Sequence, residues 1–261
     1  MDVILNWVQH NPQFIEDYRE YTTHDFFEIK PISDDILNAL THMMVDAKND
    51  PEILSDVARI IGWEKVAEYV KRRSPKKDKI KKGDFGEALI NYILSNHFNY
   101  DIPVRKLRYK LSSDQSLPAT DSLALKIVDE KIIEICYVES KTPTVYTTSV
   151  MKNAYEQLQN DYDKVIPDII MFTLEIIKKS EPELYNILKK YLGERSIQKD
   201  KDRFVIGYTC EKTAWSFTSM KNLKDVIDDD YPPAILNLVR IKNLEKLIHY
   251  VINLMGDELI D

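Results

Sequence analysis

Two carboxylates in the middle of the chain, Asp121 and Glu139, are predicted to face each other across a β-hairpin. Apolar runs on either side of a polar stretch at 129–131 indicate two antiparallel strands joined by a three-residue turn. In that register Val128 pairs with Ile132, so Asp121 lies directly opposite Glu139, with their Cβ atoms about 4.5–5.5 Å apart. Carboxylates this close repel each other unless a cation lies between them.

Lys141 is predicted to complete this cluster. Because side chains alternate along a strand, Glu139 and Lys141 project from one face and Ser140 from the other. The patch therefore offers hard oxygen ligands for Mg²⁺ or Mn²⁺, with an ammonium group beside them. The alternative is a solvent-facing hairpin end in which Asp121 and Lys141 form a surface ion pair. The acid-x-Lys spacing recurs in the chain, but here it ends a strongly apolar strand of a hairpin that carries a second acid in matching register.

An upstream acidic residue, Glu87, could add a further carboxylate. The segment GDFGEALINYILSNHF predicts a helix whose first turn holds Glu87, and Gly86 beside it allows backbone or substrate to approach closely. For Glu87 alone, the alternative is an N-terminal charge favoured by the helix dipole. By chance alone, Glu87 combined with Asp121, Glu139 and Lys141 would occur much less often than any one of these features by itself.

This combination resembles the PD-(D/E)xK nuclease superfamily, as Pro118-Ala-Thr-Asp121 followed by Glu139-Ser-Lys141. Two residues separate Pro118 from Asp121, a departure from a strict Pro-Asp pair. The stretches KKGDFGEALINYIL, PATDSLALK and YVESKTP, within roughly residues 81–159, are similar to the nuclease subunit of Hachiman anti-phage defence systems, the HamA-like proteins. The resemblance implies a restriction-endonuclease-like fold and a metal-dependent DNase that acts beside a superfamily-2 (HamB-like) helicase in bacteria.

The expected roles follow from the chemistry of these residues. Asp121 and Glu139 ligate Mg²⁺ or Mn²⁺, the Ser140 carbonyl is a candidate third protein ligand, and Glu87 is a further candidate. Lys141 orients the attacking water and offsets charge on the scissile phosphate. The number of metal ions stays open.

Basic residues near the cluster are candidates for contacts with DNA. The segment 71–82 is rich in Lys and Arg and reads either as a solvated linker or as a phosphate-contacting edge. In the second interpretation the contacts come from Lys76, Lys77, Lys81 and Lys82. A second small basic cluster lies at 105–110.

The helix expected around residues 149–161 follows the Lys141 strand and lies near the same end. Lys152 on this helix is a further candidate for phosphate contact. Some relatives use a glutamine here, and both Gln157 and Gln159 fit. A solvated polar face is the alternative for all three side chains.

Composition narrows the class of protein. The 261-residue chain is 44% hydrophobic, which is enough for a sizeable core, and its net charge of -7 argues against a protein that coats nucleic acid through bulk charge. With two cysteines and five scattered histidines, neither a zinc site nor a disulfide scaffold is expected. No apolar run is long enough for a transmembrane helix, and no signal peptide is visible, so a cytoplasmic protein with no membrane contact is expected.

The order of expected elements predicts an α/β fold, a mixed sheet flanked by helices. Residues 1–78 read as a helical N-terminal region and 79–261 as the nuclease-like domain. Within that domain, VRKLRYKL at 104–111 reads as a strand and RFVIGYTC at 203–210 as a buried parallel strand. Residues 234–254 read as a final amphipathic helix.

Two other functions stay open. One is a non-catalytic adaptor that uses a nuclease-like fold to bind and restrain a helicase, and the other is an RNA-directed nuclease. The intact acidic pair with its lysine favours catalysis, because a scaffold has no need to keep like charges together. The preference for DNA rests on the resemblance alone. Since the net acidic charge predicts weak unaided DNA binding, the helicase partner is expected to deliver or withhold DNA.

Overall fold

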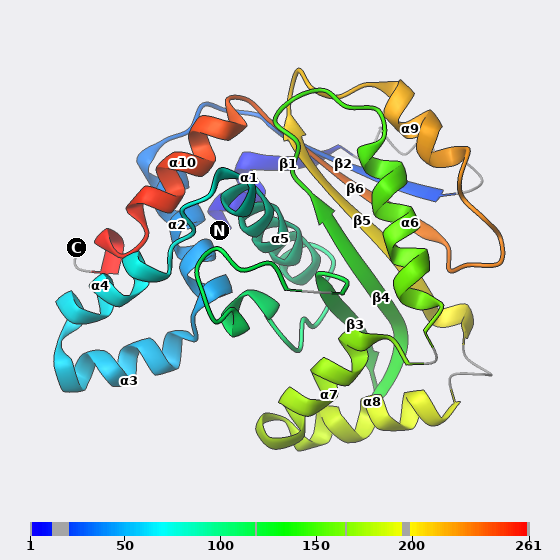
Figure 1. The fold of residues 1–261 in the computed structure, drawn as a ribbon, viewed down its shortest axis with the longest axis horizontal. Helices are drawn as coiled ribbons and strands as arrows, with labels where there is room; N and C mark the ends of the chain where they lie inside the picture. The colour runs from blue at the N-terminus through cyan, green and yellow to red at the C-terminus, as the bar shows by residue number, and fades with distance from the viewer. Residues whose placement is uncertain (1, 12–20, 118, 165, 195–198, 260–261) are drawn as a thin grey trace.

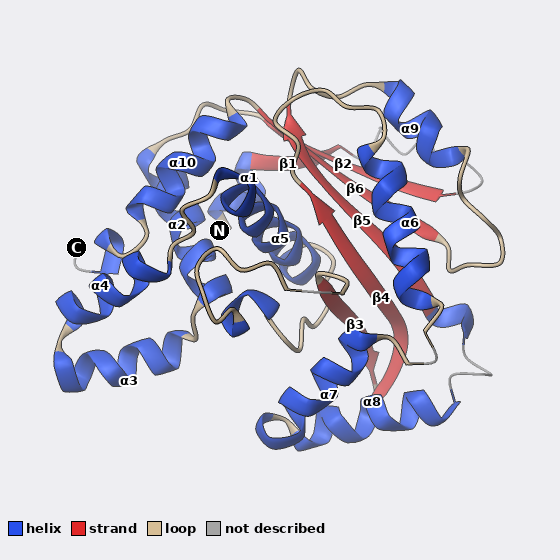
Figure 2. Cartoon of the chain, viewed as in Figure 1, coloured by secondary structure: helices blue, strands red, loops and turns tan. Residues whose placement is uncertain are grey.

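The computed structural model describes residues 2–11, 21–117, 119–164, 166–194 and 199–259. Within these ranges a six-stranded mixed sheet has the strand order β1-β2-β6-β5-β4-β3, and helices pack on both of its faces (Figures 1 and 2). The strands are β1 (Val8–Asn11), β2 (Tyr21–Glu28), β3 (Ser122–Val128), β4 (Lys131–Lys141), β5 (Asp202–Glu211) and β6 (Ala234–Ile241). This is the α/β architecture that the sequence predicts.

The helices that flank this sheet come from all parts of the described sequence. They are α1 (Val3–Trp7), α2 (Asp34–Lys48), α3 (Pro51–Ile61), α4 (Trp63–Arg73), α5 (Asp78–Asn96), α6 (Val150–Tyr162), α7 (Asp168–Ser180), α8 (Pro182–Glu194), α9 (Phe217–Lys224) and α10 (Leu244–Leu254), with short 3₁₀ turns η1 (Lys106–Tyr109), η2 (Lys199–Lys201) and η3 (Asp257–Leu259). None of the described helices has both the length and the apolar character that crossing a lipid bilayer requires.

The centre of the sheet is parallel and its two edges are antiparallel. Strands β2, β6, β5 and β4 all run in the same direction, whereas β1 and β3 run against their neighbours. β5 lies between β6 and β4, which confirms the buried parallel strand predicted at 203–210. Because a central parallel strand is covered on both faces, its residues are apolar on both.

Two hydrophobic cores lie on opposite faces of the sheet. Val138 and Val205 pack with α1, α2, α4, α5 and α10, and their neighbours Tyr137 and Ile206 pack with α6, α7, α8 and α9. Alternate residues of one strand therefore enter different cores, as the two-residue repeat of a strand requires. The end of β4 thus lies between α5 on one face and α6 on the other.

Three predictions of local structure were wrong. Residues 1–78 are not all helical, because β1 and β2 pair with each other and β2 pairs with β6. The segment 104–111 contains the 3₁₀ turn η1 and no strand. Residues 234–241 form β6, and only 244–254 form the final helix. β6 lies between β2 and β5 and is buried on both faces, so its continuous apolar run carries no strand alternation.

Residues 1–78 also contribute more to the sheet and to the hydrophobic core than a helical extension would. They supply two strands of the sheet, and α2 and α4 belong to the same hydrophobic core as α5 and α10. The basic run at 71–82 is likewise not a linker, because its residues end α4 and begin α5.

Candidate active site

The hairpin β3–β4 has the register that was predicted, although its turn is different. Asp129 and Glu130 both adopt left-handed backbone conformations, with φ of 49° and 59°, and form a two-residue turn in place of the predicted three-residue one. Val128 therefore pairs with Lys131. A bulge next to Lys126 then shifts the pairing by one residue, so that Ser122 pairs with Val138 as expected.

This register brings the predicted acids together. Asp121 directly precedes β3, and its Oδ2 accepts a hydrogen bond of 2.8 Å from the backbone N–H of Ser140. Glu139 is only 3% exposed, and its Oε1 accepts a hydrogen bond of 2.5 Å from Lys141 Nζ. The same Nζ donates to Gln157 Oε1 at 3.0 Å. The structure thus joins Gln157, one of the two glutamines considered, to the Lys141 side chain.

Glu87 reaches the cluster from the other face of the sheet. α5 begins at Asp78, so Glu87 lies in the middle of this helix and not in its first turn, as the sequence had indicated. A Cβ at Gly86 would lie 1.8 Å from Thr142 Oγ1, and it would also contact Ser140. The missing side chain of Gly86 therefore lets α5 approach the end of β4 closely and carries Glu87 to the site.

A buried lysine that the sequence did not single out holds the segment before Asp121. Lys106 is 5% exposed, and its Nζ donates hydrogen bonds of 2.9 Å to the carbonyl oxygens of Ala119 and Thr120. Ala119 has a left-handed φ of 67°, and Thr120 Oγ1 donates to Asp161 Oδ2 at 2.9 Å. The only signal in the sequence was the small basic cluster at 105–110, whose 3₁₀ turn could not be foreseen from its strand-like pattern.

A buried ion network lies beside Glu87. The Asp84 carboxylate, on the same helix, accepts hydrogen bonds from Lys48 of α2 and from Lys110, which follows η1. Both contacts are almost fully shielded from solvent. The network ties α2, α5 and the segment after η1 together on one side of the cleft.

Burial dominates the electrostatics of the acidic residues. Desolvation, and then the nearby Asp121 charge, raise the pKa of Glu139 to about 8, against the opposing effect of Lys141. The pKa of Glu87 is raised well above its usual value, first by burial and then by Asp121 and Asp84. Burial also raises the pKa of Asp121, although the Ser140 N–H and Lys106 oppose it. The cluster therefore holds carboxylates that would gain from a bound cation.

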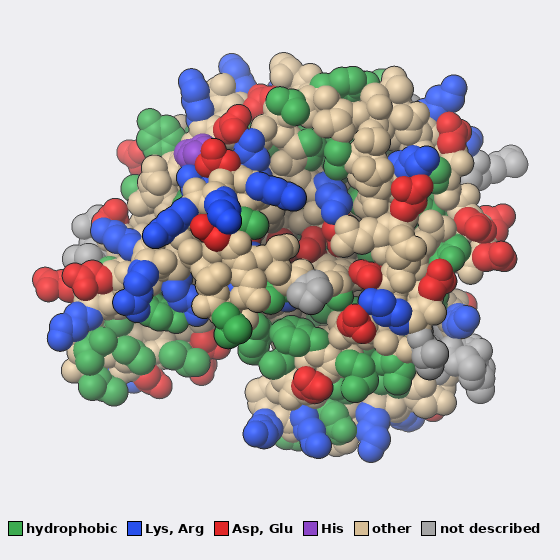
Figure 3. All heavy atoms as spheres, in the orientation of Figure 1, with side chains coloured by type: hydrophobic (Ala, Val, Ile, Leu, Met, Phe, Trp, Pro, Cys, Tyr) green, Lys and Arg blue, Asp and Glu red, His purple; other side chains and the backbone are tan. Residues whose placement is uncertain are grey.

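These residues line an open cleft. It has a volume of about 460 Å³ and is bordered by Glu87, Asp121, Glu139, Lys141 and Gln157 among others. In the space-filling view, acidic atoms lie at the bottom of a central hollow, and Lys and Arg side chains gather beside it (Figure 3).

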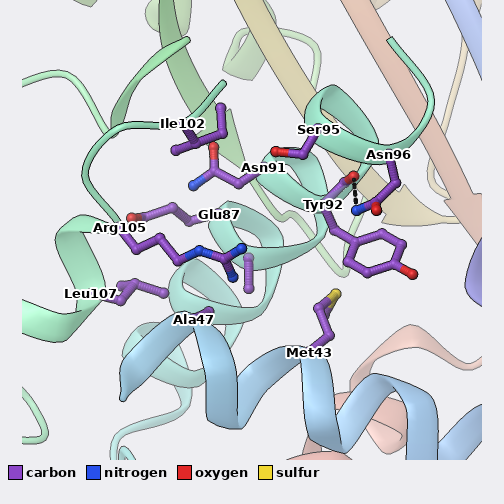
Figure 4. Close-up of a pocket in the computed structure, with 11 residues that line it drawn as sticks. Met43, Ala47, Glu87, Asn91, Tyr92, Ser95, Asn96, Ile102, Arg105 and Leu107 are labelled. Atoms are coloured by element: carbon purple, nitrogen blue, oxygen red, sulfur yellow. Dashed lines mark hydrogen bonds between the residues drawn. The ribbon is translucent and has the colours of Figure 1, made fainter. Parts of the chain in front are cut away.

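A smaller pocket on the other side of Glu87 is not a substrate site. It lies between α5 and α2 and includes Asn91 and Arg105 in its lining (Figure 4). Its volume of about 20 Å³ has room for about one water molecule. Larger molecules cannot enter it, so the larger cleft is the candidate active site.

The five lysines predicted to contact DNA are not all in the same place. Lys82 lines the cleft, where its Nζ contacts Thr144 and Glu245. Lys81 pairs with Asp78 within α5, and Lys152 pairs with Glu156 within α6. Lys76 and Lys77 lie between α4 and α5, and their backbone N–H groups donate to Asp114. Of these five residues, only Lys82 is among the residues that border the cleft.

The donor set fits a hard divalent cation. Glu139 Oε2 and Glu87 Oε1 are buried and have no hydrogen-bond partner among the described residues. Among all the residues that the structure describes, no group of three or more Asp, Glu, His or Cys side chains is arranged to hold a metal ion by itself. Mg²⁺ matches this arrangement, because it is commonly held by one or two carboxylates and keeps several waters. Pro118 of the predicted motif lies outside the described residues.

The sequence also matches a protein-family model. This model, HamA, aligns with residues 2–255. No curated protein sequence gives a significant match. The alignment extends over the N-terminal strands and the last helix as well as the carboxylate cleft, and so is wider than the segment at 81–159.

Proposed function

Because the chain belongs to the HamA family, and so is a component of a Hachiman anti-phage defence system, we propose that it is a metal-dependent nuclease. The observation that carries the proposal is the half-buried Asp121 and the buried Glu139, which lie together with Lys141 at the end of β4. This arrangement agrees with the PD-(D/E)xK pattern, in which two acids and a lysine share one hairpin face.

The acidic residues would hold Mg²⁺ or Mn²⁺. Glu139 offers its unpartnered Oε2, and Asp121 offers a carboxylate fixed by the Ser140 N–H. Glu87 and the Ser140 carbonyl are the further candidates. The chemistry that the ion supplies when bound is Lewis-acid polarisation of the phosphate and a lowered pKa for its water.

Lys141 would act on the substrate phosphate and on the water that attacks it. Its ammonium group is held between Glu139 Oε1 and Gln157 Oε1, which fixes the side chain over the cleft. A positive charge fixed in this way stabilises negative charge that develops on the phosphate without reorganisation during the reaction. Gln157 is therefore a positioning residue in this proposal.

The substrate is proposed to be DNA, delivered or withheld by a helicase partner. A chain with a net charge of -7 has few phosphate contacts to offer outside its local basic surfaces, so its unaided affinity should be low at physiological salt. Restraint by a partner would also protect host DNA from a nuclease without a strong sequence filter.

The test is a cleavage assay with plasmid DNA, linear DNA and RNA, with and without Mg²⁺ and with and without the helicase partner. Glu139→Ala and Lys141→Ala should abolish cleavage while their melting curves stay cooperative. Glu175→Ala on α7 is the control, because it removes an exposed carboxylate away from the cleft. Cleavage by Lys141→Ala at the wild-type rate would refute the site.

A further inference from the structure

A second groove, called the side groove here, adjoins the carboxylate cleft. Residues from the end of α4, from η1 and from the segment after η1 form it, including Tyr69, Arg72, Arg73, Tyr109 and Leu111. Lys110 borders both the side groove and the carboxylate cleft. The two grooves therefore have this residue in common in their walls.

Two arginines give the side groove positive charge that no carboxylate of the described residues balances. Within the described part of the chain, Arg73 donates its hydrogen bonds to neutral oxygens, namely the Tyr69 hydroxyl and the carbonyls of Arg108 and Lys110. Arg72 is exposed and has no ion pair among the described residues. By contrast, Arg108 and Lys110 are paired with Asp50 and Asp84. The side groove thus attracts an anion, although the whole chain is acidic.

Aromatic rings accompany this charge. The guanidinium groups of Arg72 and Arg73 lie 5.9 and 5.7 Å from the centre of the Tyr69 ring, which is 37% exposed. Tyr109 is 39% exposed, and Phe172 of α7 supports it in an edge-to-face contact at 5.4 Å. Leu111 next to it is 94% exposed. Exposed rings beside arginines that have no carboxylate partner are features on which unpaired bases stack.

We propose that the side groove binds an unpaired, single-stranded segment of the nucleic acid substrate and leads it to the carboxylate cleft. Arg72 contacts the phosphates, and Tyr69 and Tyr109 stack on bases. A duplex does not satisfy the same surface, because neighbouring base pairs already cover both faces of each base. The inference rests on the proposed nuclease function, and it adds the strandedness of the substrate and the path that it takes.

The test measures binding without cleavage. A fluorescein-labelled single strand and the matched duplex are titrated with protein in EDTA, and fluorescence anisotropy is followed over a range of NaCl concentrations. The single strand should bind more tightly than the duplex. Tyr109→Ala should weaken single-strand binding by about five- to a hundredfold, the usual effect of losing one stacked base. Tyr109→Phe keeps the ring and should bind as the wild type does.

Charge is tested separately. Arg72→Gln should reduce the slope of log affinity against log salt by about 0.7, the value for one phosphate contact on a single strand. Lys221→Gln on α9 is the matched control, because it removes one positive charge from an exposed residue of a helix far along the chain. Its salt dependence should equal that of the wild type.

The outcomes separate this inference from the nuclease proposal. Glu139→Ala should keep single-strand binding, since it leaves the side groove intact. Equal binding of single strand and duplex, unchanged in Tyr109→Ala, would overturn the inference even if Mg²⁺-dependent cleavage is observed. Loss of helicase binding in Tyr109→Ala with single-strand binding retained would also overturn it and would make the side groove a protein-docking surface. Groove-dependent binding without any cleavage would refute the nuclease proposal alone.

Discussion

Replacing Lys106 by methionine tests the reasoning about the carboxylate cluster most directly. The Lys106 ammonium holds two backbone carbonyls in front of Asp121, and it is also a positive charge close to Asp121, Glu87 and Glu139. Burial lowers the pKa of Lys106, and the three carboxylates oppose this effect. Methionine has a similar length but removes both the hydrogen bonds and the charge.

The expected loss follows from these contacts. Removing one partner from a buried charge network costs about 3–5 kcal/mol, because the remaining charges lose their compensation. The two carbonyl oxygens also lose donors at a buried position, and each such loss costs about 1–3 kcal/mol. The variant no longer has to bury an ammonium group, and this gain offsets part of the loss. We therefore expect metal-free Lys106→Met to be less stable by about 3 kcal/mol. For a chain of this size, that corresponds to a melting temperature lower by roughly 6–12 °C.

Urea unfolding with and without Mg²⁺ is the assay. Because the ion supplies positive charge at the same carboxylates, Mg²⁺ should recover part of the stability that Lys106→Met loses. Lys65→Met, at an exposed position of α4, is the control and should change stability little. A loss below about 1 kcal/mol, or a loss of equal size with and without Mg²⁺, would show that Lys106 does not balance the cluster.

Three further results are expected. Gly86→Ala should destabilise the fold by about 1–3 kcal/mol and weaken the effect of Mg²⁺, because its Cβ meets Thr142, whereas Gly83→Ala has free space around it and should not; urea unfolding compares the two. Glu139 keeps its proton in the folded state up to a pKa of about 8 but loses it near 4.5 when unfolded, so metal-free stability should fall as the pH rises through this window. Glu139→Gln should remove that slope and be more stable than the wild type at the upper end of the window, and an unchanged slope would contradict the assignment. Mg²⁺ should raise the melting temperature by mass action, and a shift that survives in the Asp121→Ala, Glu139→Ala double variant would place the ion elsewhere.

The carboxylate pair could be predicted because its geometry is local. Asp121 and Glu139 belong to one hairpin, and alternation along two adjacent strands fixes which residues face each other. The predicted turn was one residue too long, and the bulge after it restored the register at Ser122. The error therefore cancelled before it reached the site.

Contacts between distant parts of the chain could not be predicted in this way. β2 has β6 as its parallel partner near the other end of the sequence, and nothing in either segment encodes that pairing. The position of Lys106 depends on a 3₁₀ turn that the pattern of VRKLRYKL did not reveal. Gln157 could not be separated from Gln159, because the choice depends on how α6 is rotated against β4.

The place of β6 in the sheet has a consequence for how the chain folds during its synthesis. β6 lies between β2 and β5, so β2 cannot pair with β6 until roughly 200 further residues have been synthesised. At ordinary rates of translation this takes roughly 10–40 s, during which the β1–β2 edge has no neighbour to bind. The β3–β4 hairpin can form early, but the sheet that supports it closes only near the end of synthesis. An incomplete chain would therefore carry the acidic pair without the scaffold that holds it, and its free strand edges would be the part most exposed to aggregation.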